Sequence, residues 1–169
     1  MFDKYGEFDS AEELNREAEA LRAAGDEKSL KELTKENGLD PEDAEDYMDG
    51  YVDALATILT AAIGKLRIES EHLKLKLILL DWVDELIGMC TEDAQLAVAI
   101  RKKGQRLSGY MAALVEEGYK NRAEVSKEIT DQTKQVKSIM GNHALSIGMP
   151  DKRTRKQIAY AYYLGKQVG

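Results

Sequence analysis

The 169-residue chain has a single cysteine, Cys90, and only two histidines, His72 and His143. One cysteine excludes an intrachain disulfide framework and a zinc site made of several cysteines. The histidines do not stand in a His-Glu-x-x-His pattern, so the metalloprotease signature is absent as well. Only an accident of folding would pair Cys90 with a histidine as a nucleophile, and a structural cysteine is the better interpretation. We therefore expect no catalytic residue, no metal and no other cofactor.

Proline and aromatic residues are also scarce, with two prolines and 7% aromatic residues. Little proline in a chain rich in Ala, Leu, Glu and Lys favours helices over strands. No apolar run reaches the roughly 18 residues that a membrane span needs. The first seven residues lack the basic-then-apolar order of a secretory signal. We expect a cytoplasmic protein that makes no membrane contact.

Helix boundaries are clearly marked. Ser10 with Glu13 three residues later is typical of a capping box, and Asp40 followed by Pro41 marks another helix start. Thr91, Ser108 and Asp151 are further candidate caps, in front of helical segments. That spacing predicts helices over 51–73, 75–89, 91–103, 108–119, 124–140 and 152–164. The class is therefore all-α, with about eight or nine helices and at most one short extended segment, near 143–149.

Charge is distributed very unevenly along the chain. Residues 1–50 hold 17 acidic and 6 basic side chains, whereas residues 101–169 hold 6 and 14. We interpret 1–50 as an acidic helical lobe and 51–169 as a helical core with a basic C-terminal part, within one continuous domain. Such polarity suggests a partner with a strong electric field. The alternative is that the two parts face each other and partly cancel.

Six of the ten residues from Asp40 to Asp49 are acidic, and Asp46, Asp49 and Asp53 fall at helical spacing. Three carboxylates on one face could bind a divalent ion, but the EF-hand pattern is not met, so we favour a solvated acidic surface. A third interpretation is a partner-binding surface whose charge density resembles that of nucleic acid. The acidic candidates are Asp40, Glu42, Asp43, Glu45, Asp46, Asp49 and Asp53.

Two short segments concentrate positive charge and are candidates for binding nucleic acid or a protein partner. The first segment ends a predicted helix, where cations suit the negative end of the helix dipole. The second segment begins a helix, where cations oppose the dipole, so a binding role is more strongly indicated there. The eight basic candidates are Arg101, Lys102, Lys103, Arg106, Lys152, Arg153, Arg155 and Lys156.

Two further patterns are weaker. Asp81, Asp84 and Glu85 flank Trp82 on one face, and a two-metal nuclease would need such carboxylates with a nearby Lys or His. Trp82 itself fits a core position better than a site. Tyr160, Tyr162 and Tyr163 could stack on bases near the second basic segment, but tyrosines at this spacing are more typical of a core.

Several segments together resemble a known family. They are YGEFDSAEELN (5–15), KENGLDPEDAEDYMDG (35–50), DWVDEL (81–86), AVAIRKKGQRLSGYMAAL (97–114), LSIGMP (145–150) and AYYLG (161–165). The chain resembles a type II-A anti-CRISPR family, carried on phages and conjugative elements of gut Firmicutes, whose members inhibit the RNA-guided effector nuclease. It departs from the family over 124–140 and at Gly148–Asp151.

The resemblance implies a non-enzymatic inhibitor that binds the type II effector nuclease, or its guide-RNA complex, and blocks target DNA binding or cleavage. Such nucleases hold guide and target in positively charged channels. An acidic helix face could occupy such a channel, and a basic surface could touch guide RNA. The runner-up is a DNA-binding accessory protein of a mobile element that contacts duplex DNA through the basic segments alone.

Overall fold

The computed structural model describes residues 1–166, and the predicted all-α class is confirmed. Ten helices and two short strands make up the described chain. In order they are α1 (Ala11–Ala23), α2 (Glu27–Glu36), α3 (Pro41–Asp49), α4 (Ile58–His72), α5 (Ile78–Glu92), α6 (Ala94–Arg101), α7 (Leu107–Lys120), β1 (Ala123–Glu124), α8 (Lys127–Thr130), α9 (Gln135–Met140), β2 (Ser146–Ile147) and α10 (Lys152–Leu164).

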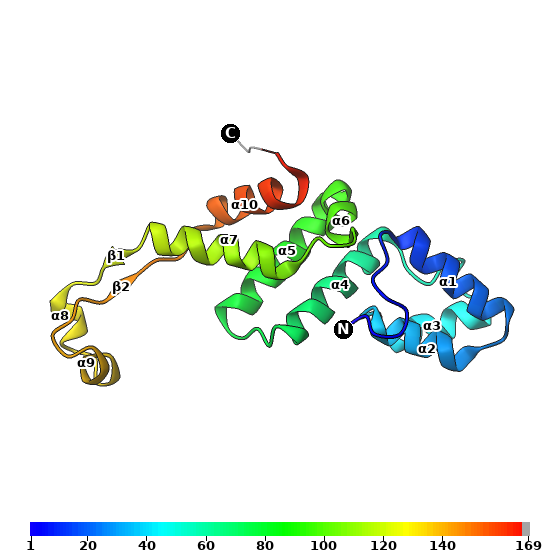
Figure 1. Cartoon of the computed structure of the whole chain (residues 1–169), viewed down its shortest axis with the longest axis horizontal. Coiled ribbons are helices and arrows are strands. Elements are labelled where there is room, and N and C mark those ends of the chain that lie inside the picture. The colour runs from blue at the N-terminus through cyan, green and yellow to red at the C-terminus, as the bar shows by residue number, and fades with distance from the viewer. Residues whose placement is uncertain (167–169) are drawn as a thin grey trace.

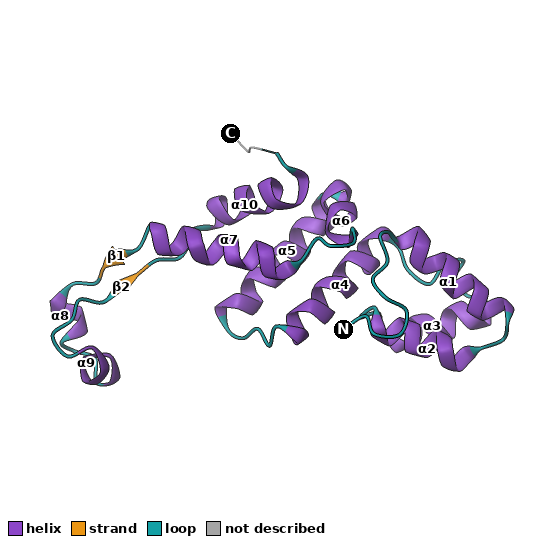
Figure 2. Ribbon diagram, viewed as in Figure 1, coloured by secondary structure: helices purple, strands orange, loops and turns teal. Residues whose placement is uncertain are grey.

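The molecule is elongated (Figure 1). An N-terminal lobe, residues 1–57 with α1, α2 and α3, forms one end. A helical core of α4, α5, α6, α7 and α10 forms the middle. An arm, residues 121–149, projects from the far end of the core and carries β1, α8, α9 and β2. Figure 2 shows that both strands lie in the stalk of this arm, between α7 and the two small helices.

Two hydrophobic clusters explain the two bodies. In the lobe, Leu14, Leu30 and Leu33 are fully buried among the three helices. In the core, Leu86, Leu96 and Leu114 are equally buried, and the cluster includes Trp82 and Cys90. Trp82 and Cys90 are therefore packing residues, as the sequence indicated. Full burial of one such leucine contributes roughly 2 kcal/mol.

Several helix ends follow the predicted caps. The Ser10 hydroxyl accepts from the Glu13 backbone N–H at 3.1 Å, and the Asp40 carboxylate accepts from the Glu42 N–H at 3.1 Å. Asp151 caps α10 by accepting from the Thr154 N–H at 2.7 Å. The predicted cap at Thr91 is wrong, because α5 continues through it and Asp93 caps α6 instead. Each confirmed cap satisfies one of the orphan donors at a helix start.

The helix predicted over 51–73 begins seven residues later than expected. Gly50 adopts φ +80° and ends α3, and residues 51–57 cross to the core without helical structure. Asn15 holds this segment, donating to the Ala56 carbonyl at 2.8 Å and accepting from the Ala56 N–H at 2.9 Å. Leu55 and Ala56 consequently pack into the hydrophobic cluster of the lobe.

The continuous helix predicted over 124–140 is wrong. Ala123 and Glu124 instead form β1, which pairs antiparallel with β2 inside the extended segment expected near 143–149. Two short helices, α8 and α9, replace the rest, and neither contains a buried residue. A helix that packs against nothing is marginal in water. One long helix over 124–140 would gain no packing, so it is not favoured over two short ones. The partner strand β1 was not expected.

None of the helices within residues 1–166 combines the length and apolar character that crossing a bilayer requires.

Candidate functional site

Three of the seven acidic candidates have partners inside the lobe, and the other four do not. Asp40 caps α3, and Asp43 completes the capping box by accepting from the Asp40 N–H at 3.0 Å. Glu45 pairs with Lys31 of α2 at 3.1 Å. These three carboxylates therefore have roles within the lobe. The remaining four, which we call the acidic face, are exposed and form no ion pair with residues 1–166: Glu42, Asp46, Asp49 and Asp53.

The predicted alignment of Asp46, Asp49 and Asp53 is only partly realised. Asp46 and Asp49 share α3, but Asp53 lies beyond Gly50 in the loop. Within the described chain, no group of three or more His, Cys, Asp or Glu side chains is placed to hold a metal ion. The acidic face therefore offers charge density rather than a preformed ligand set.

The first basic segment is used mostly inside the protein. The Arg101 side chain is buried, with 1% of its surface exposed, and donates to the Asn37 side-chain oxygen of the lobe at 2.9 Å. Arg106 pairs with Glu7 at 2.9 Å and with Glu69 at 3.4 Å. Of the four cations proposed for partner binding here, only Lys102 and Lys103 are exposed. Arg101 is thus removed from the surface candidates because its guanidinium faces the interior.

These contacts belong to an ionic cluster between lobe and core, which we call the junction: Glu7, Lys65, Glu69, Arg101 and Arg106. Lys65 is fully buried and its ammonium lies 2.8 Å from Glu7 and 2.6 Å from the Lys102 carbonyl. The Glu69 carboxylate accepts from the Leu107 backbone N–H. Residues 4–9 thereby form a strap across the two bodies, since Asp9 also accepts from the Lys103 N–H at 3.0 Å.

Burial and pairing act in opposite directions on the junction. Burial raises the pKa of Glu69 above its usual range and lowers that of Lys65, despite their opposite-charge neighbours. Burial also opposes ionisation of Glu7, but Lys65, the Gly104 N–H and Arg106 together hold its pKa below the usual range. The Glu7 carboxylate is therefore the anion that the surrounding cations stabilise most strongly.

The second basic segment remains largely exposed. Arg155 is the exception, because it pairs with Glu85 at 2.7 Å and donates to the Pro150 carbonyl at 2.6 Å. This tie to α5 explains one cation at a helix N-terminus. The other three, which we call the basic face, are exposed and form no ion pair within residues 1–166: Lys152, Arg153 and Lys156.

The nearby tyrosines do not form a stacking platform. Tyr163 is buried, with 6% of its surface exposed, and packs edge-on against Tyr162 with ring centroids 4.8 Å apart. The Tyr162 hydroxyl donates to the Arg106 carbonyl at 2.9 Å. Tyr160 is hydrogen-bonded to Asp93, which contributes, after burial, to raising its pKa. The interpretation of these residues as core elements is therefore the one that fits the structure.

In Figure 1 the acidic lobe forms one end of the molecule and the arm forms the other, while the start of α10 lies beside α7 in the core. Residues 1–50 carry a net charge of −11, whereas residues 120–156, spanning the arm and the start of α10, carry nine cations and four acidic residues. Within residues 1–166, the ion pair that joins the acidic residues 1–50 to the basic C-terminal part is that of Glu7 with Arg106. The acidic face and the basic face are thus each available to an external partner.

The residues considered for hydrolytic chemistry are dispersed. Cys90 is buried, and burial raises the pKa of its thiol to about 12, which leaves it a poor nucleophile at neutral pH. His72 ends α4, whereas His143 lies in the arm. Asp81 and Asp84 are exposed on α5, whereas Glu85 pairs with Arg155, and no group of three such side chains in the described residues could hold a metal ion. The described chain brings none of these groups together.

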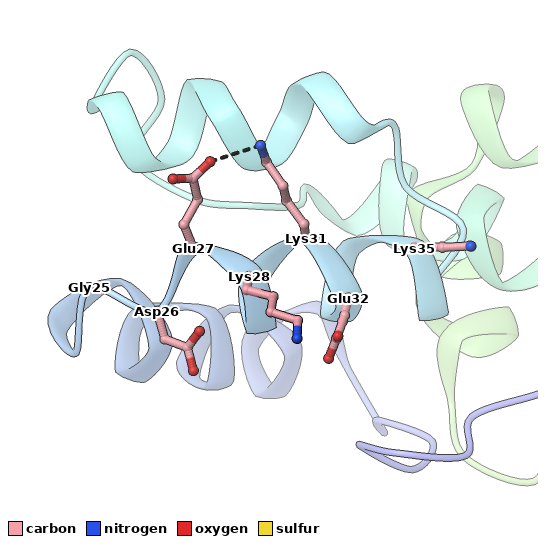
Figure 3. A pocket seen from close by; sticks show the side chains of 7 residues that line it. All are labelled: Gly25, Asp26, Glu27, Lys28, Lys31, Glu32 and Lys35. Atoms are coloured by element: carbon pink, nitrogen blue, oxygen red, sulfur yellow. Dashed lines mark ion pairs between the residues drawn. The ribbon is translucent and has the colours of Figure 1, made fainter.

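A shallow hollow on α2 is lined mostly by charged side chains (Figure 3). Glu27 and Lys31 form an ion pair at 2.8 Å and reach toward α3, while Lys28 and Glu32 point to the opposite side. Glu32 pairs with Lys4 of the strap at 2.5 Å. These side chains neutralise one another around the hollow, so it resembles a solvated helix surface rather than a ligand site.

Sequence reasoning missed the exposed apolar side chains. Leu77 at the start of α5 is 84% exposed, and Ile129 and Ile139 of the arm are 58% and 82% exposed. Ile129 and Ile139 fall within the single helix predicted over 124–140, which does not form. Only a count of apolar residues too sparse for a core helix over 124–140 could have indicated their exposure.

Comparison with protein-family models, with curated proteins and with solved structures gives no significant match.

Proposed function

We propose that this protein acts by binding rather than by catalysis, and that its target is a type II CRISPR effector nuclease carrying guide RNA. The observation that carries the proposal is the acidic face: four exposed carboxylates of the lobe without an ion pair in the described chain. Effector nucleases hold nucleic acid in positively charged channels, which such a face complements. The family resemblance of the sequence supports the same target.

The proposed mechanism is steric and electrostatic. Glu42, Asp46 and Asp49 project from a helix anchored by the Asp40 cap and by Glu45–Lys31, so their spacing is fixed before binding. Preorganisation reduces the entropy cost of association. The acidic face would occupy part of the channel that target DNA needs, and so would block DNA binding or cleavage in the cytoplasm of the bacterial host.

The direct test is a pulldown with the effector, with and without guide RNA, followed by a DNA cleavage assay. Reversing Asp46, Asp49 and Asp53 to lysine should weaken binding and restore cleavage, because three attractive contacts become repulsive. A matched control changes charge equally on the arm side: Glu116→Lys, Glu124→Lys and Glu128→Lys. The proposal is wrong if the control triple variant abolishes inhibition and the acidic-face variant does not.

The basic face favours a second candidate, a DNA-binding accessory protein of a phage or conjugative element. Lys152, Arg153 and Lys156 are exposed together at the start of α10. Phosphate contacts would be largely independent of sequence and would weaken steeply with salt. Binding of naked duplex DNA that Lys152→Glu, Arg153→Glu and Lys156→Glu abolish, with no effector binding, would favour this function.

A metal-dependent nuclease is tested separately. Plasmid is incubated with the protein and magnesium or manganese, beside Asp81→Ala. Nicking by the unmodified chain that Asp81→Ala removes would overturn the non-enzymatic proposal.

A further inference from the structure

The strap places the Glu7 carboxylate among three hydrogen-bond donors of the core. The Lys65 ammonium of α4 lies 2.8 Å from one of its oxygens. The Arg106 guanidinium lies 2.9 Å from the other oxygen, which also accepts from the Gly104 backbone N–H at 3.2 Å. An ammonium, a guanidinium and a backbone N–H are the groups with which proteins commonly bind phosphate. We call Lys65, Gly104 and Arg106 the anion site.

The loop between α6 and α7 turns two successive backbone N–H groups toward the strap. The Lys103 N–H donates to the Asp9 carboxylate at 3.0 Å, and the Gly104 N–H donates to Glu7. Gly104 has φ +81°, a left-handed conformation that glycine adopts without strain. Successive N–H groups in a turn form a concavity that binds anions. This loop therefore already binds anions, and the ones it holds are the strap's own carboxylates.

The junction also contains buried donors without a hydrogen-bond partner. Among the described residues, the buried side-chain atoms of this kind are Nε and Nη1 of Arg101, the Tyr163 hydroxyl and the Glu7 oxygen that faces Lys65. The Arg101 guanidinium lies 5.9 Å from the ring centre of Phe8, the residue after Glu7. Buried polar groups are nearly always paired, so the two Arg101 nitrogens indicate that the junction has room for a further acceptor.

The formal charges of the junction point the same way. Its cations are Lys65, Arg101 and Arg106, and its carboxylates are Glu7 and Glu69. Burial raises the pKa of Glu69, which works against its negative charge. A carboxylate has two oxygens and one charge, whereas a phosphate monoester has three terminal oxygens and a charge of about −1.5 to −2 at neutral pH. A phosphate group would therefore match the donors and cations better than the single carboxylate of Glu7.

We propose that the anion site binds a phosphate group, and that the strap closes this site by placing Glu7 in it. Phosphate takes the position of the Glu7 carboxylate when residues 4–9 lift from the core. This is an exchange of one anion for another, so Lys65 and Arg106 are not left as buried charges without compensation. The lobe stays joined to the core, because the hydrogen bond from Arg101 to Asn37 does not involve the strap.

The proposal does not depend on the proposed effector target, and its test uses the purified full chain with inorganic phosphate. Sodium chloride at equal ionic strength is the reference. Glu7→Ala removes the competing carboxylate, so calorimetric titration should show phosphate binding at least about tenfold tighter than in the unmodified chain. Phosphate should also restore most of the melting temperature that Glu7→Ala loses. Equal phosphate affinity of the two chains overturns the proposal.

Two further variants locate the bound phosphate. Arg106→Gln, combined with Glu7→Ala, removes a cation of the anion site and should abolish the gain in affinity. Lys152→Gln and Lys156→Gln, combined with Glu7→Ala, remove two cations of the basic face and should preserve it. Binding that survives the first combination and is lost in the second assigns the phosphate to the basic face and overturns the anion site.

Hydrogen exchange of the unmodified chain provides a test that needs no substitution. Phosphate at high concentration should accelerate exchange in residues 4–9 and leave α4, α6 and α7 protected, whereas chloride should do neither. Unchanged exchange of the strap overturns its role as the closing element.

Two RNA oligonucleotides of one sequence, with a 5′-phosphate or a 5′-hydroxyl, identify the source of the phosphate. Tighter binding of the 5′-phosphate form to Glu7→Ala, lost with Arg106→Gln, assigns the site to the end of a nucleic acid. Equal binding of both oligonucleotides, with inorganic phosphate still bound, assigns it to free phosphate.

Discussion

The junction and the arm reverse the usual distribution of side chains in opposite ways. At the junction, ionic groups are inside: the Lys65, Glu69 and Glu7 side chains are 1%, 3% and 5% exposed. In the arm, apolar groups are outside: Ile139 is 82% exposed, and α8 and α9 bury no residue. The junction therefore resists opening, whereas the arm has little packing that fixes its position.

This difference determines how each region should respond to substitution. A buried ion pair contributes little net stability, but removing one partner leaves a buried charge without compensation. Lys65 is in this position, because Glu7 is its closest anion. The arm contains no such dependency, so its residues should tolerate change.

Glu7→Gln should have the largest effect. It keeps the shape of the side chain but leaves Lys65 and Arg106 facing a neutral group, which should lower the free energy of unfolding by about 3–5 kcal/mol. Urea unfolding measures this loss. Asp3→Asn, directly before the strap, is the control, because the Asp3 carboxylate is 89% exposed and should contribute less than about 0.5 kcal/mol. Similar losses in both variants would contradict the inference that the junction holds the lobe and the core together.

Two glycines at close backbone contacts extend the comparison. A Cβ on Gly64 of α4 would overlap the Asn37 carbonyl oxygen, at the contact between lobe and core. One on Gly148 would lie within van der Waals overlap of the Gly118 carbonyl, at the base of the arm. Gly64→Ala should lower the free energy of unfolding by about 2–3 kcal/mol, as overpacking does in a core. Gly148→Ala should lower it by less, because the arm can move aside.

Hydrogen exchange separates these two outcomes. Gly148→Ala should accelerate exchange in residues 121–149 and leave α1–α6 protected, whereas Gly64→Ala should accelerate exchange throughout the lobe. Protection lost across the whole chain in both variants would show that the arm is coupled to the core.

The pH dependence tests the junction more finely. Glu7 has a lowered pKa, so its stabilising contribution is present above the usual glutamate range and is lost as the pH falls through the lowered value. Glu69 has a raised pKa, so its protonation favours the folded state and stability from this group rises as the pH falls from 7 toward its usual range. Glu69→Gln should therefore change stability at pH 7 by only about 1 kcal/mol.

Unfolding measured from pH 7 to pH 3 distinguishes the two carboxylates. Glu69→Gln should remove the gain at mildly acidic pH, and Glu7→Gln should remove the loss at lower pH. A Glu69→Gln variant that loses as much stability at pH 7 as Glu7→Gln would refute the dominance of burial at Glu69.

Local signals in the sequence were sufficient for much of the fold. Ser10, Asp40 and Asp151 are caps whose side chains satisfy nearby N–H groups, and this chemistry is readable without tertiary information. The start of α4 could not be predicted from local sequence, because Asn15, 41 residues away, holds Ala56 out of the helix. The helix predicted over 124–140 does not form, because its apolar residues have no core to pack against.

Which charged side chains remain exposed was harder to predict than where they concentrate in the sequence. The segments 101–106 and 152–156 look alike in sequence, yet Arg101 and Arg106 are held by the lobe while three cations of the second segment are exposed. The distinction depends on Glu7 and Asn37, which lie 64 or more residues earlier in the chain. The helix-dipole argument favoured the second segment for a binding role, and this stays a prediction. Of the four cations in that segment, only Arg155 is drawn into an ion pair, with Glu85.

Excision of the arm helices should disturb the protein least. Val125 and Leu145 are joined by a hydrogen bond of 2.7 Å from N–H to carbonyl, so the chain between them can be replaced by Asn-Gly, a two-residue turn that suits a hairpin. Because α8 and α9 bury no residue, the shortened chain should lose no stability, and the shorter loop should add up to about 2 kcal/mol. Urea unfolding of both chains measures the difference. A loss above about 1 kcal/mol would mean that the arm packs against the core, and the contrast with the junction would fail. Effector binding by the shortened chain then reports whether the arm contributes to the target contact independently of folding.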